Sequence, residues 1–242
     1  RHVLAAARRL PRLERLVHIS SVYAAGAQTG TLRAERWERP AAGFVNPYQQ
    51  TKWEAEDLVH NAMADLPIAI VRLSSIFGDS RTGAVGQYNH THQLLKFLPR
   101  NFIPLVPITE GASLDLIATD WLADNLRRDF APGTITHLCA GPGHSLGPLD
   151  LIEIASDVMT VCPSRWPRMT SMEEYEGYVS TVLSSDDRLA RESVRALHLM
   201  LPHFGLRQDF EPTPGLAAPP EPRAFVRRVV EHCVKANWGR PS

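Results

Sequence analysis

The strongest local signal in this 242-residue chain is the segment NPYQQTKWEAE, residues 46–56. Asn46 has the side chain of a helix N-cap, and Pro47 suits the first helical position because it needs no N–H there. Gln49, three residues after the cap, completes the pattern of a capping box. The segment therefore predicts a helix that begins at Pro47 and runs to about Asp65.

Short apolar runs on either side of this helix are typical of buried parallel strands. Residues 16–19 form the first run and end in Ser20 and Ser21, whereas residues 68–73 form the second run. Ligands of open α/β sheets bind at the carboxyl ends of the strands. We therefore expect Ser20 and Ser21 to face a cleft.

Strand and helix patterns continue to alternate along the chain, joined by short links. The later patterns are a helix at 88–98, an extended stretch at 99–107, a strand at 114–117, a helix capped by Thr119 or Asp120, a strand at 134–139 and a helix at 148–159. This order predicts a parallel sheet covered by helices.

Beyond Cys162 the sequence shows helical patterns only, around 171–174, 185–200 and 223–234, with a Pro-rich linker at 211–222. We therefore expect two parts. Residues 1–160 form the sheet domain, with a substrate-side insertion at about 80–113. Residues 161–242 form a small, mostly helical cap that binds substrate.

Composition narrows the range of functions. Lys plus Arg and Asp plus Glu number 26 each, so the net charge is zero, which argues against a general nucleic-acid or membrane-surface binder. The three cysteines are far apart, so neither a disulfide framework nor a thiolate zinc site is indicated, and we assign no metal. No membrane span or signal peptide is recognised, and a cytoplasmic location fits best.

Tyr48 and Lys52 lie four residues apart, so both side chains should project from one face of the helix. An ammonium group beside a phenol stabilises tyrosinate and makes the phenol a better proton donor. The same lysine can hydrogen-bond the ribose of a nicotinamide cofactor, and the Ser21 hydroxyl can hold a substrate carbonyl. The four-residue spacing alone is weak evidence for a catalytic pair, because it often occurs by chance on the solvated face of a helix.

Three segments of the sequence, taken together, strengthen the interpretation of Tyr48 and Lys52 as a catalytic pair. They are HISSVYAAG at 18–26, NPYQQTKWEAE at 46–56 and RLSSIFGDSRTG at 72–83. In this order they resemble the extended short-chain dehydrogenase/reductases, and most closely their thioester reductase and fatty acyl reductase branch. The resemblance covers about residues 1–158 and implies a doubly wound, Rossmann-type sheet.

The resemblance also implies roles for individual residues. Tyr48 becomes the general acid, Lys52 the cation that holds the cofactor, and Ser21 the hydroxyl that orients the carbonyl. Ser20 is the alternative to Ser21 and a cofactor contact, since a shift of one residue along a strand reverses the face. The residues expected to line the nicotinamide are Ser74, Ser75 and Ile76. Leu73 replaces the proline usual in the family, a departure that concerns the local backbone.

The family begins with a strand, a glycine-rich turn and a helix that hold the cofactor pyrophosphate, and no such pattern precedes the first strand here. We therefore expect the N-terminal half of the domain to be absent from this chain. The glycines at 141–147 have the wrong spacing for the dinucleotide fingerprint. The preference between NADPH, which is favoured, and NAD is expected to lie outside this chain.

The predicted function is reduction, by NAD(P)H, of an acyl thioester on a carrier protein or coenzyme A, or of the derived aldehyde. The chain is expected to be part of a larger multidomain protein. One alternative is an epimerase or dehydratase of nucleotide sugars that uses bound NAD. Another is an inactive fragment or a binding scaffold.

Overall fold

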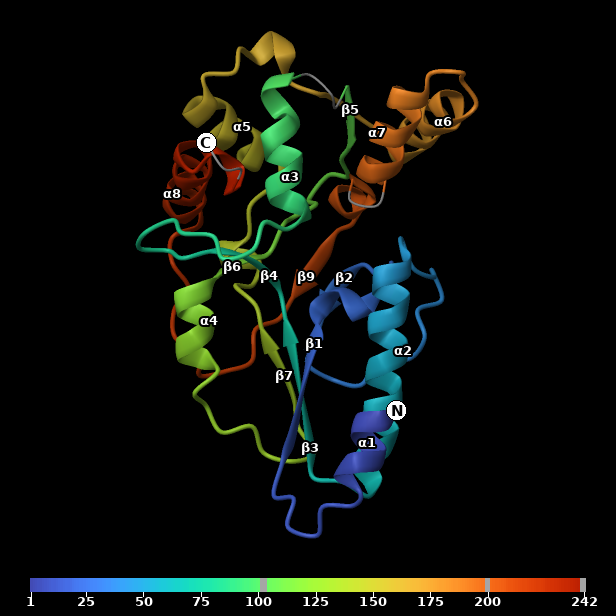
Figure 1. Ribbon diagram of the computed structural model, residues 1–242, viewed down its shortest axis with the longest axis vertical. Helices are drawn as coiled ribbons and strands as arrows, with labels where there is room; N and C mark the ends of the chain where they lie inside the picture. Colours follow the sequence, from blue (N-terminus) through green and yellow to red (C-terminus); the bar gives the residue numbers. More distant parts are fainter. Residues whose placement is uncertain (101–103, 199–200, 240–242) are drawn as a thin grey trace.

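A computed structural model describes residues 1–100, 104–198 and 201–239. Its centre is a parallel sheet of three strands in the order β1-β3-β7, where β1 is Leu16–Ser21, β3 is Ile68–Leu73 and β7 is Ile135–Leu138. The three strands point the same way, toward the upper end of Figure 1. Their carboxyl ends therefore meet at one edge, as the sequence predicts.

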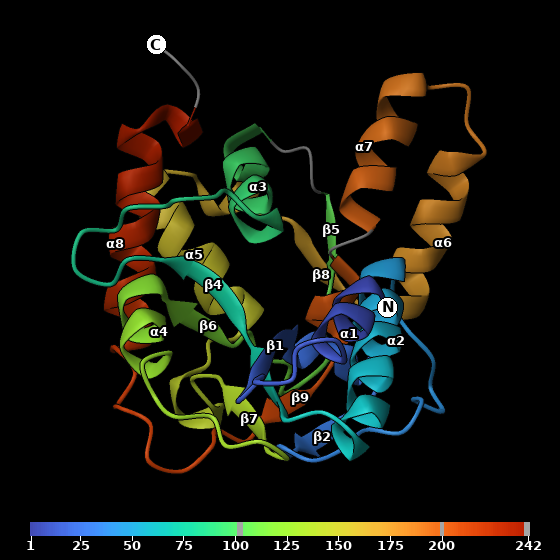
Figure 2. The same cartoon turned by 60° about the horizontal axis from the view of Figure 1, so that its bottom comes forward.

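Helices cover both faces of this sheet. Alternate residues of β3 point to opposite faces, so each face presents apolar side chains for a helix to cover. Ile68 and Ile70 pack with Leu4 of α1 (His2–Ala7), beside α2 (Pro47–Asn61). Ala69 and Val71 belong to the larger core that contains α4 (Thr119–Asn125). Figures 1 and 2 show α2 and α4 on opposite sides of the sheet. The predicted doubly wound α/β fold is confirmed.

A second layer lies beyond the carboxyl ends of the strands. There β4 (Ser75–Gly78) pairs in parallel with β6 (Leu116–Ala118), and α5 (Pro148–Met159) packs against α8 (Pro222–Lys235). The rings of Phe77 and Phe225 meet edge to face, with centroids 6.1 Å apart, which joins α8 to β4. The helix α3 (His90–Phe97) lies in the same layer. The last long helix therefore belongs to the core around the sheet.

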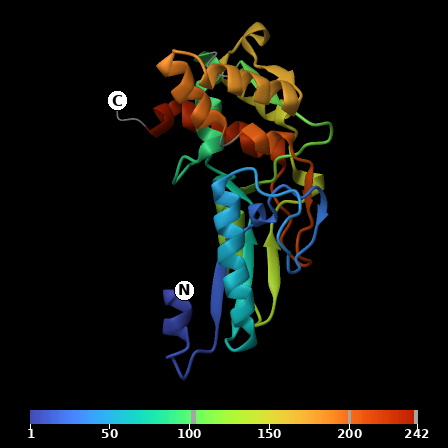
Figure 3. The ribbon, with the colours of Figure 1, turned by 90° about the vertical axis from the view of Figure 1, so that its right-hand side faces the viewer.

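The C-terminal third is mostly helical, but it also contains two short strands that the helical patterns did not predict. The strand β8 (Arg168–Thr170) pairs with β5 (Leu105–Pro107), and β9 (Gln208–Phe210) pairs with β2 (Gly30–Leu32). Each has three residues and pairs with a distant segment, which leaves no periodicity to detect. Between them the helices α6 (Met172–Leu183) and α7 (Arg188–His198) form a hairpin beyond the carboxyl ends of the central strands (Figure 3).

Helix boundaries agree with the sequence except in details. The N-cap of α4 is Ala118, and the predicted cap Asp120 instead accepts hydrogen bonds from the backbone and hydroxyl of Ser80. Parts of two predicted elements, 101–103 and 199–200, lie outside the described residues. Short 3-10 helices complete the structure: Val22–Ala25 (η1), Ala62–Ala64, Leu98–Arg100, Pro142–His144, Pro163–Arg165, Leu201–Gly205 and Asn237–Gly239. Among the described helices, none has the length and apolar character needed to span a bilayer.

Candidate functional site

The start of α2 is fixed by its cap. The Asn46 side chain accepts a hydrogen bond from the backbone N–H of Gln49 at 3.0 Å, and Pro47 occupies the first turn. The Gln49 side chain accepts from the N–H of Val45 at 2.8 Å. These contacts define the helix start, and with it the direction in which the next residue, Tyr48, projects.

Tyr48 and Lys52 share one face of α2, as predicted. The Lys52 Nζ lies 5.8 Å from the centroid of the Tyr48 ring, and Tyr48 is half exposed. Within the described parts of the chain, no carboxylate forms an ion pair with Lys52. Burial lowers the pKa of His18 on β1; Glu56 opposes this shift, whereas the Lys52 ammonium adds to it. The Lys52 ammonium is therefore near enough to His18, in the middle of β1, to influence its charge.

Ser21 is the last residue of β1 and caps η1, the turn that packs against α2. Its Oγ accepts a hydrogen bond from the backbone N–H of Tyr23 at 3.2 Å. This contact uses the oxygen as acceptor, so the hydroxyl proton of Ser21 can be donated elsewhere. Ser21 therefore keeps the property for which the sequence singled it out.

Ser20 has a different environment from its neighbour. Its hydroxyl donates to the Glu56 carboxylate at 2.5 Å, and the residue is buried. Its hydroxyl proton is thus used inside the protein, and the cofactor contact at Ser20 stays a prediction. Alternation along β1 separates the two serines, as expected for a strand.

The three residues expected at the nicotinamide also differ from one another. The buried Ser74 donates its hydroxyl to the backbone oxygen of Asp115 at 2.7 Å. The Ser75 side chain is hydrogen-bonded to Tyr23. Ile76 is 38% exposed. The cofactor contacts of all three residues stay predictions.

Sequence reasoning missed Tyr23. Burial raises the pKa of this phenol, and the nearby Asp115 and Tyr48 add to the shift. Its ring meets Phe210 of β9 edge to face at 6.2 Å. Tyr23 therefore lies beside Tyr48 as a second, protonated phenol, and its position two residues after Ser21 was the available signal.

The backbone amides of the glycine-rich loop after β7 already bond a side chain of the protein itself. The backbone N–H groups of Ala140 and Gly141 donate to the buried Asp115 carboxylate at 2.9 and 2.7 Å. Amides so occupied do not hold a pyrophosphate. This agrees with the interpretation of the loop as a structural connection.

Comparison with known proteins identifies the family of this chain. A family model described as male sterility protein, of an NAD-binding class, matches residues 1–126, about half of the chain. The chain belongs to the male sterility protein family. This match agrees with the resemblance predicted from the three segments. No curated protein matches the chain in sequence.

Solved structures share the fold. The terminal R domain of the myxalamid PKS-NRPS pathway matches with a TM-score of 0.67 and 20% identity, over 93% of this chain and 59% of that one. The dTDP-glucose 4,6-dehydratase of Bacillus anthracis, in complex with NAD, gives 0.63 and 11%, over 98% and 66%. The UDP-glucuronic acid 4-epimerase of Bacillus cereus, also with NAD, gives 0.53 and 18%, over 70% and 54%. This chain thus spans about six tenths of the length of its structural relatives.

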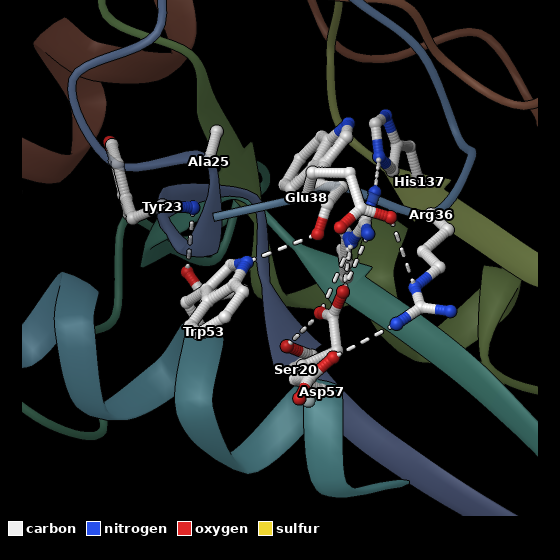
Figure 4. A network of polar contacts seen from close by, with 12 residues as sticks. Ser20, Tyr23, Ala25, Arg36, Glu38, Trp53, Asp57 and His137 are labelled. Atoms are coloured by element: carbon white, nitrogen blue, oxygen red, sulfur yellow. Dashed lines mark hydrogen bonds and ion pairs between the residues drawn. The ribbon is translucent and has the colours of Figure 1, made fainter. Parts of the chain in front are cut away.

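In this member of the male sterility protein family, a buried ion pair lies beneath the site. Arg72 of β3 is fully buried, and its Nε and Nη2 donate to the Glu56 carboxylate at 2.5 to 3.1 Å. Figure 4 shows Ser20 and His137 at opposite ends of this network. The motif contained Glu56 and Arg72, but sequence reasoning gave neither of them a role.

His137 on β7 completes the network as a neutral ring. Its Nε2 accepts from Arg72 Nη1 at 3.0 Å, and its Nδ1 donates to the backbone oxygen of Glu211 at 3.1 Å. Burial lowers the pKa of His137 to about 3, and the Arg72 charge contributes. The ring therefore joins the sheet to the C-terminal segment. Among the described residues, no cluster of His, Cys, Asp or Glu has the makings of a metal site.

Proposed function

We propose that this chain carries the proton-transfer site of an NAD(P)H-dependent reductase that acts on acyl thioesters or the derived aldehydes. The observation that carries the proposal is the pairing of Tyr48 with Lys52 on one face of α2, the helix that packs against the turn η1 after Ser21. Ser21 adds a hydroxyl whose proton is free to be donated.

The chain's own residues supply the proton chemistry. A nicotinamide cofactor, when bound, supplies hydride to the carbonyl carbon. Ser21 donates a hydrogen bond to the carbonyl oxygen, and Tyr48 transfers its phenolic proton to that oxygen as negative charge develops. Lys52 stabilises the tyrosinate that remains and can hydrogen-bond the ribose of NADPH, the favoured cofactor, or of NAD.

The substrate proposal is a thioester on a carrier protein or on coenzyme A. Its support is the likeness to a terminal R domain of a PKS-NRPS pathway, together with the fraction of that domain that this chain spans. We accordingly propose that the chain works within a larger multidomain protein. The free cysteines Cys139, Cys162 and Cys233 suit a reducing, cytoplasmic setting.

A second candidate is a nucleotide-sugar epimerase or dehydratase. The fold matches to a dTDP-glucose 4,6-dehydratase and a UDP-glucuronic acid 4-epimerase favour it. The two reactions differ in cofactor use, because an epimerase regenerates its NAD in each cycle whereas a reductase consumes NADPH.

Cofactor stoichiometry tests the proposal. The protein that contains this chain is mixed with NADPH and a long-chain acyl-CoA or an acylated carrier protein, and in parallel with NAD and UDP-glucuronate or dTDP-glucose. We expect one NADPH oxidised per aldehyde formed, or two per alcohol, and no change in the sugar. Sugar conversion without net NADPH loss would instead establish the second candidate.

A further inference from the structure

We propose that Glu56 and Arg72 are positioning residues that hold Tyr48 and Lys52 in place opposite the end of β1. The inference rests on the proposed function for its effect on turnover. The geometric part, that this buried pair fixes the first turns of α2, stands on the contacts alone.

Glu56 continues the line of the site residues along α2. It follows Lys52 by one turn and Tyr48 by two turns, so all three side chains lie on one face of the helix. Along this line exposure falls, from the half-exposed Tyr48 to Glu56, which is 5% exposed. The face that presents the phenol to a ligand is thus anchored at its buried end by a carboxylate.

That carboxylate is bonded to both strands beside α2. It accepts hydrogen bonds from two guanidinium nitrogens of Arg72 on β3 and from the hydroxyl of Ser20 on β1. Ser20 directly precedes Ser21. One side chain therefore connects the helix that carries the proton donor with the strand that carries the carbonyl-binding hydroxyl.

Arg72 cannot follow Glu56 if the helix shifts, because other segments hold it. Its guanidinium stacks on the Trp37 ring, with Cζ 3.3 Å from the ring centroid, and Nη1 is bonded to the neutral His137. The backbone oxygen of Trp37 in turn accepts the indole N–H of Trp53 on α2 at 3.1 Å. The cation is thus a fixed point between α2, the 33–45 loop and β7.

Stability and positioning make different demands on such a pair. Apolar residues of similar size often replace a buried ion pair without loss of stability. They cannot reproduce the directional bonds to Ser20 and Arg72, and small displacements of reacting groups cost large factors in rate. A variant that folds well but lacks the bonds therefore separates the two roles.

The main test compares Glu56→Leu/Arg72→Met with the wild-type protein that contains this chain. The control is Arg8→Gln/Asp65→Asn, which removes an exposed ion pair between the end of α1 and the turn after α2. The readouts are the urea midpoint, kcat and KM for thioester reduction, and amide hydrogen exchange of residues 50–55 against the β7 strand.

We expect the apolar variant to unfold at a urea concentration close to that of the wild type, with kcat at least tenfold lower and KM within about threefold. Exchange at 50–55 should rise at least tenfold, with β7 unchanged, whereas the control changes none of these. A stable variant with wild-type kcat and wild-type exchange at 50–55 overturns the inference.

Two further outcomes stay informative. If the wild type reduces no thioester, the proposed function fails, and the exchange comparison still decides whether the pair positions α2. If the apolar variant does not fold, Ser20→Ala takes its place, because it removes one bond to Glu56 and leaves the ion pair. Faster exchange at 50–55 in Ser20→Ala supports the inference, and unchanged exchange contradicts it.

Discussion

Single residues divide into those whose role follows from spacing and those whose role depends on what packs against them. Tyr48 and Lys52 share a helix face because they are four residues apart, and the structure agrees. The hydrogen-bond partners of Ser20 and Ser74 were not predicted, since strand alternation gives the face of a residue but not its partner. The partner of Ser20 is Glu56, which lies 36 residues away in the sequence.

Lys52 gives a prediction at this scale. Lys52→Met removes the cation near Tyr48 and the ribose contact, so we expect kcat/KM for thioester reduction to fall about 10²-fold and NADPH binding to weaken. Steady-state rates and a fluorescence titration of NADPH measure the two effects. The matched control is Lys235→Met, at the exposed end of α8, with both values unchanged. Unaltered turnover in Lys52→Met would remove this lysine from the site.

At the scale of elements, local signals predict helices well and short strands badly. The cap of α2 lies within four residues of sequence, so Asn46 and Pro47 sufficed to locate it. By contrast, β9 exists because it pairs with β2, which lies far away in the sequence. Three-residue strands have too few positions to show alternation, and nothing local indicated them.

The turn at Gly83 gives an element-scale prediction. Its φ is +75°, and a Cβ would overlap the backbone oxygen of Arg228 on α8. Gly133 has a φ of +84° and open space around it. In both alanine variants the positive φ strains the backbone by about 1 kcal/mol, but only Gly83→Ala also displaces α8. We expect Gly83→Ala to lose at least about 1 kcal/mol more in urea unfolding, and equal losses would contradict the packing.

At the scale of the whole molecule, the Arg72 network joins the sheet to the C-terminal segment. Thr213 accepts from the backbone N–H of His137 at 2.8 Å, and the ring bonds Glu211. Neither contact was predictable, because the Pro-rich segment carries no pattern that says where it docks. The sequence predicted the sheet and its helices, whereas the course of residues 206–221 required the structure.

This network predicts a pH dependence of stability. The folded protein holds the pKa of His137 at about 3, whereas an unfolded histidine titrates near 6.5. Below pH 6.5 the unfolded state therefore binds a proton at His137 that the folded state does not bind. Stability from this group is complete above pH 6.5 and is lost as the pH falls toward 3, by about 1 kcal/mol per pH unit.

Urea unfolding of the wild type and of His137→Gln between pH 7 and 4 measures this difference. The variant should have the shallower slope of unfolding free energy against pH. Burial also lowers the pKa of His92, to about 4, and that contribution remains in both proteins. Parallel slopes would mean that His137 is not held neutral by Arg72 and its buried position.

The most direct test of the account is the rate of NADPH oxidation by an acyl thioester with Tyr48→Phe, compared with Tyr23→Phe. Both variants remove one phenolic hydroxyl, but only Tyr48 has Lys52 beside it. We expect Tyr48→Phe to lower kcat at least 10²-fold with NADPH binding retained, and Tyr23→Phe to stay within about tenfold of the wild type. Near-normal turnover in Tyr48→Phe would contradict the assignment of this residue as the proton donor.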